Sequence, residues 1–83
     1  MISFKLDFFY KDDNAIVWID SFSLEKGDEE VTHLLNSNNE SSDCNFAELV
    51  LFDSANQRVI CKLVCFKKIK LKDKGYHWIV SER

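Results

Sequence analysis

The stretch ISFKLDFFY, residues 2–10, decides the fold class because apolar and polar side chains alternate along it. One face of the stretch carries Ile2, Phe4, Leu6, Phe8 and Tyr10, and the other carries Ser3, Lys5, Asp7 and a single aromatic, Phe9. Successive side chains of a β-strand point to opposite faces of its sheet, so a period of two indicates a half-buried strand. A mostly β protein is therefore expected.

The residues that follow this strand predict a hairpin. Residues 11–14, KDDN, are rich in side chains that hydrogen-bond their own backbone and tolerate left-handed geometry, which is typical of a turn. Residues 15–24 are rich in β-branched and aromatic side chains and predict a second strand.

Residues 25–36 change character and predict a short helix. Asp28 is placed to cap it, Glu29 and Glu30 suit its positive end, and Val31, Leu34 and Leu35 form a short apolar stripe. Residues 37–43 contain only Ser, Asn, Glu and Asp and predict a polar loop.

The remaining chain predicts a meander of three strands. Residues 45–53 and 76–81 each form one strand, and residues 58–72 form one long strand or two bent ones. Residues 54–57 and 73–75 are the turns, and Gly75 supplies a positive φ in the second. The expected fold is α+β and mostly β, with an antiparallel sheet of four to five strands and one short helix between strands 2 and 3. Residues 1–83 are expected to form a single domain.

Composition bounds the class of protein. The chain has 83 residues, of which 46% are hydrophobic, and this content favours a folded domain with a modest core. Its start lacks a basic leader, and no stretch approaches the ~20 apolar residues that span a membrane. The three cysteines are an odd number, which favours free thiols in a reducing, cytoplasmic setting.

No motif in the sequence names a reaction. Cys61 and Cys65 would lie ~13 Å apart on a strand, too far to share one metal ion. The two glycines, Gly27 and Gly75, form no phosphate-binding loop. His33 and His77 have no cysteine beside them at a helix start, where a thiol is activated. We therefore expect no metal, no cofactor and no enzymatic activity.

The charges are divided along the chain. Residues 1–53 hold 12 acidic and 3 basic side chains, whereas residues 54–83 hold 8 basic and 2 acidic ones. This division predicts either a molecule with two oppositely charged faces or two halves that pair within one sheet.

Acidic and aromatic side chains of the first half form one candidate surface for a basic protein partner. Its residues are Asp7, Phe9, Asp12, Asp13, Trp18, Asp20, Glu29 and Glu30. Exposed aromatics beside carboxylates are typical of binding hot spots. The alternative is that the helix covers this face and that both aromatics belong to the core.

The basic strand forms a second candidate surface. Lys62, Phe66, Lys68, Lys70 and Lys72 have the same strand parity, and a basic strand with an aromatic can bind single-stranded nucleic acid. The alternative is an edge strand that its lysines protect against aggregation.

Three features resemble the cloacin-type bacteriocin immunity proteins, which inhibit toxin nucleases. They are the opening strand at residues 5–10, the acidic helix at residues 27–35 and the aromatic strand at residues 76–78. The resemblance implies a curved antiparallel sheet that binds a basic toxin domain, although this chain turns basic after residue 54. The leading hypothesis is therefore a small protein inhibitor of a toxin or of a host defence or transcription component, immunity-type or phage-encoded. Nucleic-acid binding and a homodimeric accessory subunit are the alternatives.

Overall fold

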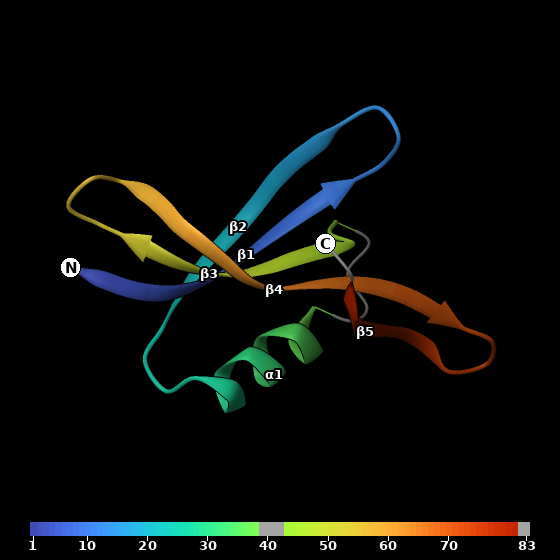
Figure 1. Cartoon of the computed structure of the whole chain (residues 1–83). Coiled ribbons are helices and arrows are strands. Elements are labelled where there is room, and N and C mark those ends of the chain that lie inside the picture. Colours follow the sequence, from blue (N-terminus) through green and yellow to red (C-terminus); the bar gives the residue numbers. More distant parts are fainter. Residues whose placement is uncertain (39–42, 82–83) are drawn as a thin grey trace.

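The computed structural model describes residues 1–38 and 43–81, which form one antiparallel sheet and one helix (Figure 1). The strands are β1 (Ile2–Lys11), β2 (Ile16–Leu24), β3 (Phe46–Asp53), β4 (Arg58–Leu71) and β5 (Gly75–Ser81), and the helix is α1 (Asp28–Ser37). The predicted mostly β fold with a helix between the second and third strands is confirmed. Residues 39–42 of the predicted polar loop lie outside the described residues.

The strands are arranged in the order β2-β1-β3-β4-β5. Each neighbouring pair is antiparallel, so β1–β2 and β3–β4–β5 are the predicted hairpin and meander. The two units join where β1 pairs with β3 across the helical connection, with Leu6 opposite Leu49 and Phe8 opposite Ala47. This long-range pairing places α1 over one face of the sheet (Figure 1).

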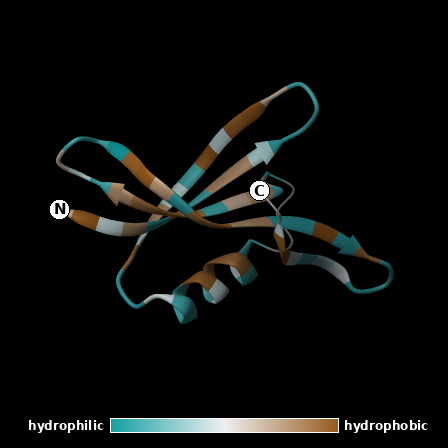
Figure 2. Cartoon of the chain, in the orientation of Figure 1, coloured by the Kyte–Doolittle hydropathy of each residue, from teal (hydrophilic) through white to brown (hydrophobic). Residues whose placement is uncertain are grey.

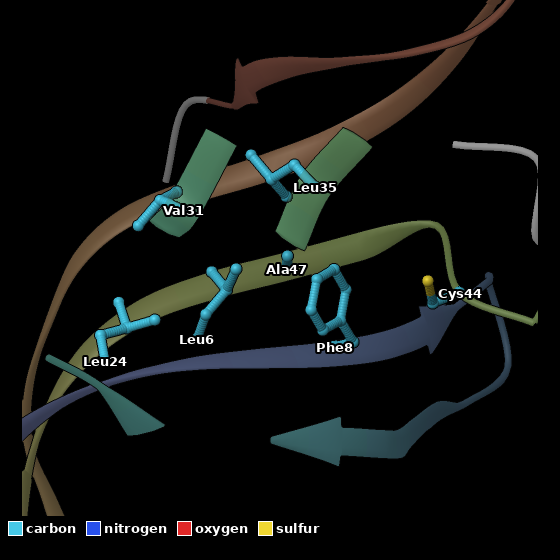
Figure 3. Packing of buried hydrophobic residues seen from close by; sticks show 7 residues of the cluster. All are labelled: Leu6, Phe8, Leu24, Val31, Leu35, Cys44 and Ala47. Atoms are coloured by element: carbon cyan, nitrogen blue, oxygen red, sulfur yellow. The ribbon is translucent and has the colours of Figure 1, made fainter. Parts of the chain in front are cut away.

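The main core lies between α1 and that face. Figure 3 shows Leu6 and Phe8 from β1 pointing toward Val31 and Leu35 of the helix. Phe8 is 1% exposed, and its ring meets the rings of Phe22 and Trp78 edge-on at centroid distances of 5.9 and 5.8 Å. These side chains supply the apolar burial that holds the helix on the sheet.

The helix begins one residue earlier than its acidic residues suggested. Gly27 is the N-cap, with φ of 85°, and Asp28 is the first helical residue and makes no capping hydrogen bond. The prediction that Asp28 caps the helix is therefore wrong. Glu30 reaches back from the first turn, and its Oε1 accepts hydrogen bonds from the backbone N–H groups of Glu25 and Lys26. A glycine suits the cap because its positive φ would strain other residues.

Bulges decide which side chains share a face. In β2, Asp20 pairs with Phe8 and Trp18 pairs with Phe9, so Ile19 is the extra residue of a bulge. In β4, Val64 pairs with Leu49 and Lys62 pairs with Val50, so Leu63 is the extra residue of another. Because side chains alternate along a strand, one extra residue moves everything beyond it to the opposite face.

Within the described part of the chain, no helix is long and apolar enough to cross a membrane.

Candidate protein-binding face

The face of the sheet opposite α1, here called the open face, carries a trough of about 360 Å³. Its lining comes from all five strands and includes Phe9, Ile16, Phe46, Glu48, Lys62 and Cys65. β1 and β3 bring the aromatic part together, because Phe9 and Phe46 are register partners whose ring centroids lie 6.4 Å apart. The trough is thus built by pairing between strands far apart in the sequence.

Polar groups within the trough satisfy one another. Glu48 is 9% exposed, and its Oε2 lies 3.0 Å from the Lys62 ammonium and 3.8 Å from the Cys65 Sγ. The neighbouring carboxylate Asp7 accepts a hydrogen bond from the Ser21 hydroxyl. Paired in this way, the two carboxylates can remain in a partly buried position.

Lysines lie over two aromatic rings of the open face. The Lys5 ammonium is 4.1 Å from the centroid of Phe52, and that of Lys11 is 4.8 Å from the centroid of Phe46. These cation–π contacts hold the lysine side chains along the sheet. The open face therefore carries both signs of charge and is not an acidic surface.

The predicted partner-binding residues fall into two groups. Phe9 and Asp7 lie on the open face, Trp18 is the register partner of Phe9, and Asp12 and Asp13 occupy the exposed turn between β1 and β2. Trp18 is 58% exposed, so the alternative that it belongs to the core does not hold. Phe9 is half-buried against Phe46. These five residues cluster on one hairpin.

The other three acids lie elsewhere. Asp20 shares the face of Phe8, because the bulge at Ile19 separates it from Trp18 despite their spacing of two residues. Glu29 and Glu30 belong to the first turn of α1, which covers that same opposite face. The structure therefore divides the predicted acidic surface between the two sides of the sheet.

The predicted nucleic-acid surface is divided as well. The bulge at Leu63 places Lys62 on the open face, whereas Phe66 packs against the core on the helix side. Lys68 and Lys70 pair with Trp78 and Tyr76 on that side, and Lys72 follows in the turn. The Lys68 ammonium is 2.7 Å from the backbone oxygen of Asn38. β3 pairs with residues 58–67 of β4 and β5 with residues 65–71, so each end of β4 pairs with one of them, and edge protection by the lysines is kept as an alternative.

Several trough residues were missed by sequence reasoning. Ile16, Phe46, Glu48 and Cys65 join Phe9 only through pairing across the sheet. One signal for them was present, because Glu48 is the single charged side chain inside the otherwise apolar stretch 46–52. A carboxylate there indicates a polar partner opposite it.

Comparison with protein-family models, curated protein sequences and solved structures found no match for the chain. The resemblance to cloacin-type immunity proteins therefore stays a prediction. Among residues 1–38 and 43–81, no three His, Cys, Asp or Glu side chains are grouped so that they could hold a metal ion.

The three thiols should differ sharply in reactivity. Cys61 is exposed, whereas Cys44 and Cys65 are buried. Burial raises the pKa of the Cys44 thiol, and Asp43 adds to this, although the Lys68 ammonium opposes it. Because the thiolate is the reactive form, a raised pKa lowers its fraction near pH 7.5.

We expect a chromogenic disulfide reagent at pH 7.5 to label one thiol per chain quickly and the other two on the order of a hundredfold more slowly. Unfolding in denaturant should release all three, and Cys61→Ser should abolish the fast phase. Two fast thiols in the native protein would contradict the burial of Cys44 or Cys65.

Proposed function

We propose that the protein is a small inhibitor that binds another protein through its β1–β2 hairpin and the adjoining open face. The observation that carries the proposal is the exposure of Trp18, a large aromatic that lies beside the trough and is not used by the core. Tryptophan is among the residues that most often dominate the binding energy of an interface.

The surroundings of Trp18 support a binding role. Ile16, Val17 and Ile19 are also exposed. Ile16 lies on the open face with Trp18, whereas Val17 is the register partner of Tyr10 on the other face. Figure 2 shows the start of β2 as a brown segment on the hairpin that projects away from α1. Contiguous exposed apolar groups with a polar rim are typical of protein-interaction sites.

The charges of the hairpin support a basic partner. Asp12 and Asp13 occupy its turn, and both are exposed. Proteins that act on nucleic acids carry basic surfaces, which an acidic hairpin complements. We therefore propose as target a basic toxin nuclease, or a component of host defence or transcription.

Nucleic-acid binding by the basic strand has less support. Lys62 faces Glu48 on the open face, apart from Lys68 and Lys70. Phe66 packs against the core, whereas base stacking requires an accessible aromatic face. The geometry favours the β1–β2 hairpin as the binding element.

The electrostatic part of the proposal is tested with the double variant Asp12→Asn/Asp13→Asn. The N–H groups of Asn14 and Ala15 donate to Asp12 Oδ1 at 2.8 and 2.9 Å, and an asparagine oxygen can accept both bonds, so the turn is kept. A partner captured from the source cell should associate on the order of tenfold more slowly with this variant at low salt. The measurement is the association rate by surface plasmon resonance, with wild type and variant converging as salt rises.

The matched control is Glu29→Gln, because Glu29 lies on α1 on the other side of the sheet. It should leave the association rate unchanged. Equal rates for wild type and the double variant at every salt concentration would refute the acidic-hairpin proposal.

A further inference from the structure

β5 and the first three residues of β2, Ile16 to Trp18, lack the usual protection of an edge strand. No described strand pairs with the outer side of β2 or β5. Native proteins commonly protect such edges with lysine, proline or inward charges. β5 contains no charged residue, β2 contains only Asp20, and neither contains lysine or proline.

Both edges also expose apolar side chains. Ile16 is 65% exposed on β2, and Val80 is 68% exposed on β5. The bulge at Ile19 limits regular pairing on β2 to its start, next to the acidic turn. An exposed apolar edge of this kind is a template for a further strand.

Net charge indicates which edge strand of a second copy can pair with each edge strand of the first. The β1–β2 hairpin, residues 2–24, holds four acidic and two basic side chains. β4 and β5 with their turn, residues 58–81, hold seven basic and one acidic. Joining two β2 edges or two β5 edges brings like net charges together, whereas joining β2 to β5 brings opposite charges together.

Strand direction brings the charged turns to the same end. Every neighbouring pair in the sheet is antiparallel, so β2 and β5 run in the same direction. β2 begins after the turn that holds Asp12 and Asp13, and β5 begins after the turn that holds Lys72 and Lys74. Figure 1 shows both turns on the right of the molecule. A second copy in the same orientation therefore places its basic turn beside the acidic one.

We propose that copies of this protein associate head to tail, with the start of β2 of one copy pairing in parallel with β5 of the next. The backbone groups of the two edges hydrogen-bond, and the acidic and basic turns attract each other at one end. Each copy uses two different edges, so the assembly grows by addition or closes into a ring. This association goes beyond the proposed inhibitor function and requires no other protein.

Two single variants block one edge each. Ile16→Lys places a lysine on β2, and Val80→Lys places one on β5, both at highly exposed positions where the fold tolerates them. Val59→Lys is the matched control, because Val59 is 44% exposed and lies on β4, outside the two proposed edges β2 and β5. All three change the charge equally, and circular dichroism verifies that each variant is folded.

Sedimentation velocity of the purified protein decides the proposal. The mean mass of wild type and of Val59→Lys should rise above the 9.7 kDa of one chain as concentration rises, and less so at high salt. Each edge variant alone should stay at the monomer mass. An equimolar mixture of the two should reach twice that mass and no more, because one intact β2 edge meets one intact β5 edge.

Three results would overturn the proposal. Wild type could stay monomeric at every concentration, one edge variant alone could dimerise, or the mixture could stay monomeric. The second result would indicate pairing of identical edges. Because the experiment uses the purified chain alone, its failure leaves the inhibitor proposal untouched, and the partner measurements above test that proposal separately.

Discussion

Replacing Phe8 with alanine is expected to destabilise the protein by about 3–5 kcal/mol. Phe8 is 1% exposed and lies between the rings of Phe22 and Trp78, beneath the helix residues Val31 and Leu35. Truncation removes its apolar burial and leaves a cavity among β1, β2, β5 and α1. A domain of this size has a total stability on the order of 5–15 kcal/mol, so much of it would be lost.

Urea unfolding followed by circular dichroism measures this effect, and the midpoint of thermal unfolding should fall by about 15 °C or more. The matched control is Phe4→Ala, the same substitution on the same strand and face. Phe4 is 46% exposed, so its loss should cost far less. Similar losses for the two variants would contradict the placement of the core beneath α1.

Replacing Trp18 with alanine is expected to weaken binding of the protein partner by about 30-fold or more, which corresponds to about 2 kcal/mol. Trp18 stands on the open face as the register partner of Phe9, and more than half of its surface is exposed. The free protein therefore loses little packing, whereas the complex loses a large aromatic contact. Isothermal titration calorimetry with the captured partner measures the change in Kd.

Tyr10→Ala provides the control for this prediction. Tyr10 is an exposed aromatic of the same hairpin, but strand alternation places it on the face opposite Phe9. It should leave the Kd within about twofold, and both variants should unfold within about 1 kcal/mol of wild type. A Kd that rises with Tyr10→Ala and not with Trp18→Ala would transfer the binding surface to the helix side.

Ile16 belongs to both proposed binding surfaces. Ile16 lines the trough and also begins the edge of β2, so a bound partner and a second copy compete for the same segment. A partner in excess should therefore dissociate head-to-tail assemblies, since binding to one state shifts the equilibrium toward it.

Local patterns in the sequence predicted the elements of the fold. Alternation along residues 2–10 predicted β1, the KDDN turn predicted the first hairpin, and the apolar stripe of Val31, Leu34 and Leu35 predicted α1. Gly75 takes a φ of 75° in the turn where positive φ was expected. Such features depend on neighbouring residues only, because backbone sterics and side-chain alternation act over a few positions.

The binding face could not be predicted in the same way. Trp18 and Asp20 have the same parity in the sequence, as do Lys62 and Phe66, yet one bulged residue in each strand puts them on opposite faces. A bulge arises from the fit between two paired strands, and the alternation within one strand does not contain it.

Local sequence patterns thus predicted the strands, the turns, the helix and the separation of acidic from basic residues along the chain. The pairing of β1 with β3, the outermost positions of β2 and β5, and the exposure of Trp18 became known with the assembled sheet. Edges, bulges and troughs arise from contacts between segments distant in sequence, so no local pattern contains them. Phe9 meets Phe46 and Asp7 meets Glu48 only when the sheet has assembled.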